Sequence, residues 1–276
     1  MERPIRKALI LWLCLSPLMI IILFPFVVMI STALKSQVEV LAYPPRWIPQ
    51  EIAWENFANM WEAARLGPAV LNSIMISVAA TAICLIVAIP AAYASARMDF
   101  RGDRLFRQFL LVTQMLSPIV LVLGIFRLMA KMGMVDQLPA LVLAYVAFNL
   151  AFSVWMLQAY FQTIPRELEE AATLDGATSL QRLRLVFLPL AAPAIGITSV
   201  FIFIYCWNEF VLAMTLLRSN EKYTLTMQIF SLVGGRYQVE WDHVMGATLV
   251  ASVPVAIVFA MLQRYLVSGL TVGAVK

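Results

Sequence analysis

The chain has 276 residues, of which 62% are hydrophobic, and it carries a net charge of +4 with a mean hydropathy of +0.85. Soluble domains average about half apolar residues, and the excess here lies in long runs, which argues against a soluble globular protein. The charge comes from loop lysines and arginines and does not indicate a nucleic-acid surface. The three cysteines fit neither a disulfide framework nor a metal site.

Six apolar runs predict six transmembrane helices, because a helix needs about 20 residues to cross a bilayer core of roughly 30 Å. None of the runs alternates as the strands of a membrane barrel do, so the predicted fold class is an all-α membrane protein. The chain is expected to form a single transmembrane domain. The predicted spans are about 8–34, 68–96, 105–128, 140–161, 190–217 and 244–267.

The segments between the spans predict the orientation of the chain. Six spans place both termini on one side, and that side holds twelve of the 20 lysines and arginines. Cytoplasmic loops carry the excess of positive charge, so the termini and the loop 165–189 are predicted to be cytoplasmic. The loops 35–67 and 218–242 then lie outside. Prolines inside the second, third and sixth spans indicate either irregular packing or functional hinges.

The cytoplasmic loop 165–189 is polar and reads as two short helices. Pro165 fits the first helical position, and Gly176 predicts the end of the first helix because glycine tolerates a left-handed cap. Thr178 and Gln181 form a capping box that starts the second helix. Acidic residues crowd the first turn, where the helix dipole favours them: Glu167, Glu169 and Glu170. Two short helices joined rigidly to spans can transmit a push from a soluble partner.

Glu209 is the one carboxylate inside a predicted span. A charge at membrane depth is costly, so this residue either serves a function or lies near the interface and pairs with a neighbouring chain. Trp207 and Asn208 beside it would offer a ring face and an amide to a polyhydroxylated ligand. Further polar residues within spans could line a path or bond between helices, which is the commoner role: Asn72, Gln114, Asn149 and Gln158.

Catalysis by this chain alone is not expected. The only histidine, His243, lies at the edge of the sixth span, and no nucleophile, acid and base can be assembled around it. The sequence also lacks the glycine-rich lysine loop that cradles nucleotide phosphates. A secondary, ion-coupled transporter remains an alternative, although that class usually shows internal repeats and buried coupling carboxylates. A membrane enzyme is a third possibility, against which the missing catalytic set argues.

The cytoplasmic loop resembles the EAA signature of bacterial ABC-importer permeases. Its matching parts are Glu170-Ala171-Ala172, Gly176 and Val186-Phe187-Leu188-Pro189, with valine in place of the usual isoleucine. Three further segments resemble the maltose-type carbohydrate permeases: Asp175-Gly176-Ala177, Trp207-Asn208-Glu209-Phe210 and the tail Gly269–Lys276. The resemblance extends over essentially the whole chain and implies the type I ABC importer permease fold with cytoplasmic coupling helices.

The resemblance also implies a function and a set of partners. The chain would be the non-catalytic permease subunit of an ATP-driven importer that moves a sugar or sugar derivative across the bacterial cytoplasmic membrane. It would pair with a second, homologous permease and with two ATPase subunits, which bind the ATP and Mg, so that this chain itself binds no cofactor. A periplasmic or lipid-anchored solute-binding protein would deliver the sugar; the remaining partner is membrane lipid, and no nucleic acid is involved.

Residue roles follow from the resemblance alone. The segment 167–185 would dock in a cleft of one ATPase subunit, the tail 269–276 would reach the ATPase pair, and the loop 218–242 would probe the cleft of the binding protein. The expected ATPase-coupling residues are Glu167, Glu169, Glu170, Ala171, Ala172, Asp175, Gly176, Ala177, Arg182 and Arg184. The substrate-path candidates are Trp207, Asn208, Glu209, Asn149 and Gln114, and no metal ligand is expected.

Overall fold

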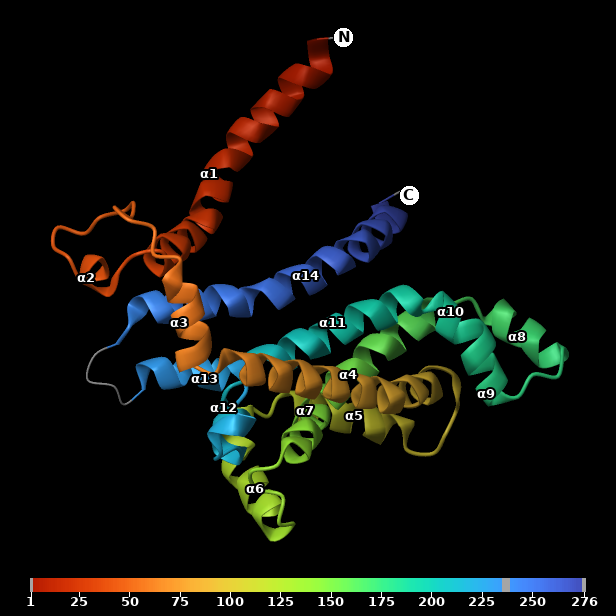
Figure 1. Cartoon of the computed structure of the whole chain (residues 1–276). Coiled ribbons are helices and arrows are strands. Elements are labelled where there is room, and N and C mark those ends of the chain that lie inside the picture. Colours follow the sequence, from red (N-terminus) through yellow and green to blue (C-terminus); the bar gives the residue numbers. More distant parts are fainter. Residues whose placement is uncertain (1, 235–238, 275–276) are drawn as a thin grey trace. The chain divides into compact units, whose positions relative to one another are not determined.

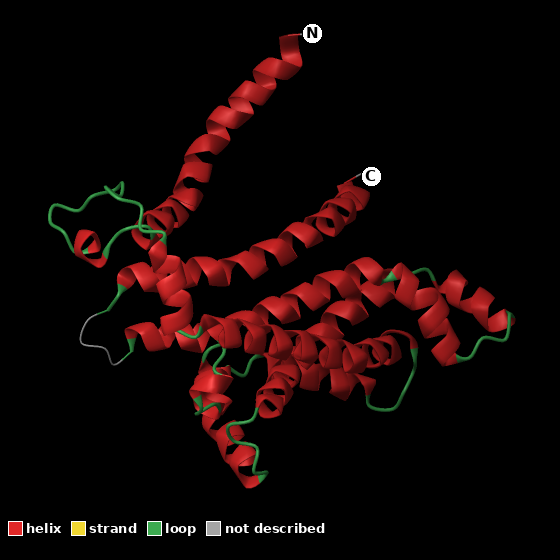
Figure 2. Ribbon diagram, in the orientation of Figure 1, coloured by secondary structure: helices red, strands yellow, loops and turns green. Residues whose placement is uncertain are grey.

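The computed structural model describes residues 2–234 and 239–274, with side chains described for 11–234 and 239–261. Within these ranges every regular element is a helix (Figures 1 and 2). The chain divides into two compact units: a first unit of Met1–Gly67 with Gln228–Val253, and a second unit of Pro68–Met227 with Pro254–Lys276. The longer helices are α1 (Glu2–Ala33), α4 (Leu66–Arg97), α5 (Asp103–Gln114), α6 (Pro118–Lys131), α7 (Leu138–Thr163), α11 (Ala192–Asn208) and α14 (Trp241–Ala274).

The first unit joins the end of α1 to a short extramembrane helix, α3 (Glu55–Ala63). The amide of Asn56 donates hydrogen bonds to the carbonyls of Ala33 and Lys35, at 3.0 and 2.7 Å, and so caps the end of α1. Met60 is buried, and its sulfur would lie 2.8 Å from a Cβ placed on Gly246 of α14. The missing side chain at Gly246 therefore lets α3 and α14 approach closely.

Helix α1 is apolar on all sides. Its stretch Leu11–Ala33 has a mean hydropathy of 2.8, and its most apolar part buries nothing inside the chain. A helix that is hydrophobic all round and buries so little of its apolar surface within its own chain faces lipid or another subunit. The prediction of a retained first span therefore fits this helix.

The second unit is built around α7, against which α5 and α11 both pack (Figure 1). Tyr145 and Phe161 of α7 are fully buried. One apolar cluster around Tyr145 draws residues from α4, α6, α11 and α12 (Val211–Leu216). The other, around Phe161, draws residues from α4, α5 and the segment 183–194. These clusters fix the loop 165–189 to the spans, because Leu183 and Phe187 of that loop belong to the second cluster.

The third predicted span is not one continuous helix. Helix α5 ends at Gln114, α6 begins at Pro118, and their axes differ by 101°. Pro118 disfavours helical backbone at the preceding residue, and Ser117 is indeed extended, with ψ 136°. By contrast, Pro90 and Pro254 lie inside continuous helices, α4 and α14. Of the span prolines, Pro118 therefore coincides with a break, and its position at the start of a helix explains why.

The fifth predicted span, 190–217, also differs. A bend of 80° separates Ser179–Leu190 from α11, and α11 ends at Asn208. Glu209 then adopts extended backbone, with ψ 133°, before the short helix α12. Four helices are long and apolar enough to cross a membrane, or up to six if each bent pair counts as one span, within the residues described. The number of expected spans is reached only if each bent pair counts as one span, and the second pair includes Ser179–Leu190, which lies mostly in the loop 165–189.

Candidate functional site

The loop 165–189 forms two short helices whose ends the sequence predicted. Helix α8 (Arg166–Leu174) begins one residue later than expected, with Pro165 at the N-cap. Gly176 has a left-handed φ of 81°, and the amides of Gly176 and Ala177 bond to the carbonyls of Thr173 and Ala172, at 3.0 and 2.9 Å. This pairing is a Schellman cap. It makes the turn between the helices rigid.

Helix α9 (Ser179–Arg182) begins with the predicted capping box, since the side chain of Thr178 accepts from the amide of Gln181, whose own side chain accepts from the amide of Thr178. A π-helical turn, η1 (Leu183–Phe187), follows, and the sequence analysis missed it. Pro189 explains this turn, because a proline clashes with the carbonyl four residues earlier, and a wider turn relieves that crowding.

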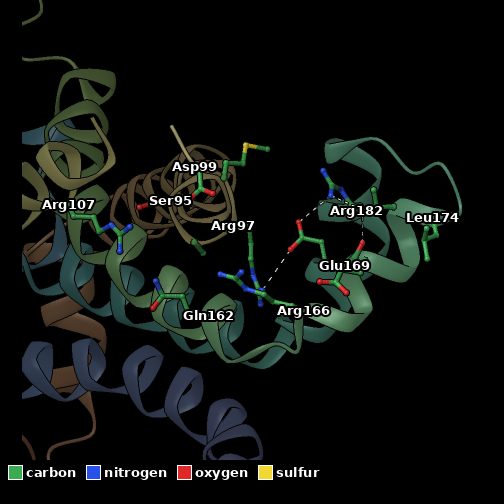
Figure 3. A pocket seen from close by; sticks show the side chains of 13 residues that line it. Ser95, Arg97, Asp99, Arg107, Gln162, Arg166, Glu169, Leu174 and Arg182 are labelled. Carbon is green, nitrogen blue, oxygen red and sulfur yellow. Dashed lines mark hydrogen bonds and ion pairs between the residues drawn. The ribbon is translucent and has the colours of Figure 1, made fainter. Parts of the chain in front are cut away.

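Glu169 is the point at which the two short helices join the spans (Figure 3). Its carboxylate accepts a hydrogen bond from the Tyr93 hydroxyl of α4 at 3.1 Å. The same carboxylate lies 3.9 Å from the guanidinium of Arg97, at the end of α4, and 3.5 Å from that of Arg182, on α9. One carboxylate of α8 is therefore shared by α9, which follows it in the chain, and by α4, which is some seventy positions away.

Arg97 is itself held by the spans. Its side chain is only 4% exposed and donates to the carbonyl of Phe161 at 2.6 Å and to the carbonyl of Ile164. Its guanidinium also lies over the ring of Phe187, 5.1 Å from the centroid. A buried charge is costly unless it is paired and hydrogen-bonded. The position of Arg97 therefore depends on Glu169, the end of α7 and the π-helical turn together.

A pocket of about 840 Å³ lies between this junction and the ends of α4, α5 and α7 (Figure 3). Arg107 and Gln162 lie at one end of the view, and Arg182 and Leu174 at the other. The pocket is lined by Ser95, Ala96, Arg97, Met98, Asp99, Arg107, Gln162, Arg166, Glu169, Glu170, Thr173, Leu174 and Arg182. Four arginines and three carboxylates line this pocket, and Asp103, which pairs with Arg107, brings a fourth carboxylate to its edge.

The predicted coupling residues divide between two faces of the loop. Those that are exposed are Glu167, Glu170, Ala171, Asp175, Gly176 and Arg184. Those that are half-buried are Glu169, Ala172, Ala177 and Arg182. Leucines that the sequence analysis did not single out add apolar surface to the outer face, with exposed fractions of 89% for Leu174 and 73% for Leu180. Tyr93 and Arg97 were also missed, because no local pattern links them to a residue some seventy positions away.

Two of the substrate-path candidates are brought together. Gln114 and Asn149 line a pocket of about 450 Å³ at the break between α5 and α6. Aromatic side chains surround them, from α7 and α11: Phe148, Phe152, Phe201 and Tyr205. The amide of Asn149 donates to the carbonyl of Tyr145 at 2.8 Å, so its side-chain oxygen stays available. Ring faces beside amides suit a polyhydroxylated ligand.

The other candidates lie apart from that pocket. Trp207 is buried and stacks on Phe203, with ring centroids 5.8 Å apart, and Asn208 is exposed and bonds back to the carbonyl of Ile204. Glu209 accepts from the Tyr145 hydroxyl at 2.9 Å and from the amides of Leu212 and Ala213, at 2.8 and 3.2 Å. A carboxylate is stabilised at a helix N-terminus. Glu209 therefore caps the start of α12.

Asp136 forms a second carboxylate junction, in the turn between α6 and α7. It accepts from the Ser219 hydroxyl at 2.5 Å and from the amides of Ser219 and Arg218 at 3.0 and 2.8 Å. Lys222 lies 3.1 Å away. The Ser219 hydroxyl and the two amides, assisted by Lys222, hold the pKa of Asp136 well below its usual range. This contact ties the turn to the start of the loop 218–242.

Two expectations fall partly outside the described residues. The side chains of the tail Gly269–Lys276 lie beyond them, as do positions 235–238 of the loop 218–242. No group of three His, Cys, Asp or Glu side chains that could hold a metal ion occurs among the residues that were searched, which are those the structure describes.

Comparison with known proteins extends over nearly the whole chain. Residues 85–272 match the family described as binding-protein-dependent transport system inner membrane component. The chain is 36% identical, over 92% of both sequences, to the diacetylchitobiose uptake system permease protein DasC of Streptomyces coelicolor. It is 34% identical, over its full length and 99% of the relative, to the trehalose/maltose transport system permease protein MalG of Thermococcus litoralis.

A solved structure shares the fold. The chain superposes with a TM-score of 0.79 and 25% identity on a chain of a bacterial ABC transporter involved in the import of the acidic polysaccharide alginate. The match covers 96% of this chain and 98% of that one. The predicted all-helical importer fold is therefore confirmed.

Proposed function

The chain belongs to the family of inner-membrane components of binding-protein-dependent transport systems, and on that premise we propose that it is the permease subunit of an ATP-driven importer for a sugar or sugar derivative. It is a multi-pass protein of the inner membrane. The names of its relatives support the substrate class, since they refer to diacetylchitobiose and to trehalose and maltose. Both termini are placed in the cytoplasm by the distribution of lysine and arginine.

The observation that supports the coupling role is that Tyr93, Arg97 and Arg182 share the carboxylate of Glu169. A separate ATPase subunit docks on the exposed face of α8 and α9, where Leu174 and Leu180 supply apolar area. The Schellman cap at Gly176 keeps the two helices in one orientation. Movement of this pair then passes through Glu169 to Arg97 and the end of α4. Two helices that keep one orientation and are linked to α4 by the Glu169–Arg97 salt bridge transmit a displacement, whereas a flexible loop would absorb it.

The transport cycle has two states. ATP and Mg bind to the partner ATPases, which close, move the docked segment 167–185 and rock the spans from inward-open to outward-open. The sugar passes from a periplasmic or lipid-anchored binding protein and is released inward after hydrolysis. This chain supplies no group to the hydrolysis of ATP. A second permease of the same family completes the substrate path. Residues 1–276 act as one transmembrane domain.

The substrate path on this chain runs past the break between α5 and α6. Gln114 and Asn149 offer amide groups there, and the rings of Phe148, Phe152 and Tyr205 offer faces on which a sugar can stack. The extended segment at Ser117 opens this side of the bundle. Trp207, Asn208 and Glu209 shape the path from behind, because Glu209 orients Tyr145 and so the backbone that holds Asn149.

The coupling role is tested by Glu170→Lys, which reverses a charge on the exposed face and leaves Glu169 intact. We expect the variant to assemble in the membrane but to lose ATP-driven uptake, or to release the ATPase subunits on purification. Normal uptake with Glu170→Lys would exclude this face as the docking site.

The substrate path is tested separately by Asn149→Ala. The substitution should lower the affinity of uptake about tenfold, because a hydrogen bond to a buried polar group contributes roughly 1–2 kcal/mol. The ATPase rate without substrate should stay unchanged. Unaltered uptake affinity across a panel of sugars would remove this pocket from the path.

A further inference from the structure

A groove runs between α5 and α7, away from the sugar pocket. One wall is the face of α5 that carries Arg107, Leu110 and Leu111. The other is the face of α7 that carries Trp155, Gln158, Ala159 and Gln162. These residues are three and four positions apart within each helix, so each set forms one continuous stripe. The groove has a volume of about 220 Å³.

The groove opens into the pocket of about 840 Å³ that lies beside the Glu169 junction. Arg107 and Gln162 line both hollows, and Figure 3 shows these two side chains at one end of the pocket. The combined site therefore has a charged end and an apolar end. Trp155 and Leu111 are about half exposed, at 50% and 51%, so the apolar end is open at the surface of a transmembrane bundle. An exposed apolar surface on such a bundle is suited to contact with hydrocarbon.

The charged end has hydrogen-bond donors to spare. Asp103 takes two of the five guanidinium N–H groups of Arg107, and the other three remain. Arg166 makes no ion pair within the described part of the chain, and the side-chain amides of Gln158 and Gln162 make no hydrogen bond there. The carboxylates of the pocket, at 99, 169 and 170, do not line the groove.

We propose that the seam between α5 and α7 binds an anionic phospholipid of the cytoplasmic leaflet. The phosphate lies against Arg107 and Gln162, Arg166 adds positive charge, and Gln158 donates to the ester region. One acyl chain follows Leu110, Leu111 and Trp155. Charge complementarity selects an anionic headgroup, and basic pockets at the cytoplasmic ends of spans are suited to such headgroups. The apolar groove distinguishes a lipid from free phosphate, which would need only the charged end.

The site adjoins the coupling junction, since the same pocket contains Arg97, Glu169 and Arg182. A headgroup bound there stands within the cavity that separates the short helices from the spans. Occupancy is therefore expected to alter the stability of the junction without contacting a sugar or a nucleotide. This inference depends on membrane insertion and not on the identity of the transported substrate.

The test measures lipid binding to the full-length chain, isolated from the membrane with whatever subunits accompany it. Native mass spectrometry would follow titration with phosphatidylglycerol, phosphatidylcholine and inorganic phosphate. We expect at least tenfold tighter binding of phosphatidylglycerol than of phosphatidylcholine. Arg107→Gln should lower phosphatidylglycerol affinity about tenfold, because it removes a charge-assisted hydrogen bond, and Arg107→Lys should restore most of it.

Arg104→Gln is the matched control, since Arg104 is an exposed arginine of the same helix that lines neither hollow. It should change the affinity less than twofold. Ala159→Leu narrows the groove at an exposed position and should weaken both lipids but not inorganic phosphate. Three results would each overturn the proposal. They are equal losses of lipid affinity with Arg107→Gln and Arg104→Gln, no preference for the anionic lipid, and lipid binding that is unchanged by Ala159→Leu. Competition by inorganic phosphate at the affinity of the lipid would assign a phosphate site instead.

Discussion

Glu169 and Asp136 are both carboxylates that join distant segments of the second unit, but they are held differently. Glu169 is bound by side chains alone, at 3.1 to 3.9 Å, from residues with several rotatable bonds. Asp136 is bound by two backbone amides and a hydroxyl, at 2.5 to 3.0 Å. Backbone donors cannot reorient without moving the chain. The comparison teaches that the junction at Glu169 can adjust its length while the loop junction at Asp136 is fixed.

That difference matches the proposed roles. A junction that carries motion from α8 and α9 must tolerate small changes of angle, and long side chains permit them. A junction that holds one loop in place gains from short hydrogen bonds, which are the stronger ones when one partner is charged. The two ends of the unit therefore use the same chemical group for opposite mechanical purposes.

The largest effect is expected from Glu169→Ala. The change leaves the nearly buried Arg97 without its carboxylate, and breaking such a buried pair costs about 3 kcal/mol or more. We expect a lower melting temperature of the purified protein and loss of uptake. Glu167→Ala, an exposed glutamate of the same helix, is the matched control for stability and should leave the melting temperature unchanged. Equal melting temperatures of the two variants would show that the contacts of Glu169 do not stabilise the protein.

Asp136→Asn should have a smaller effect, on stability alone. The amide keeps the shape of the side chain but loses the charge that Lys222 and the two backbone amides favour, at a cost of about 1 to 2 kcal/mol. Melting of the purified protein measures the loss, and uptake per folded molecule should be retained. Glu221→Gln changes an exposed carboxylate of the same loop and should be neutral. Loss of coupling with Asp136→Asn would mean that the fixed junction also moves.

The pH dependence of stability tests the junction at Asp136 by itself. The folded state lowers the pKa of Asp136 from its ordinary value of 3.8, so the unfolded chain binds a proton first as the pH falls. The stabilisation by ionised Asp136 is therefore fully present well above pH 3.8, and it is lost progressively as the pH falls below that value. Melting curves from pH 6 to pH 3 should fall more steeply for the parent protein than for Asp136→Asn. Parallel curves would show that the Asp136 contacts add no stability.

The smallest effects come from two glycines, one near each junction. Gly176 and Gly133 have positive φ values, 81° and 68°, and a Cβ would meet nothing within 4 Å at either. Alanine at each position should cost roughly 1 kcal/mol because of the left-handed backbone alone. Uptake should fall only with Gly176→Ala, which loosens the turn between α8 and α9. Similar losses of uptake at both positions would mean that stability, and not coupling, limits transport.

Part of this picture could be read from the chain in advance. The caps at Gly176 and Thr178 depend on residues within five positions of each other, so local rules predicted them correctly. The apolar runs likewise predicted helices, because hydrocarbon demands that backbone groups bond within a segment. The break before Pro118 was foreseeable only as a kink, since proline limits its neighbour but does not fix the angle.

The sequence by itself determined the number of apolar runs, the caps of the polar loop 165–189 and the family to which the chain belongs. Only the tertiary structure decided which carboxylates form junctions: Glu169 meets Arg97, and Asp136 meets Ser219, across some seventy to eighty positions of sequence. It also decided that Glu209 starts a helix and that Gln114 and Asn149 share a pocket. The physical reason is that a charge in a membrane protein is stabilised by whichever groups packing brings within hydrogen-bond distance, and packing is not a local property.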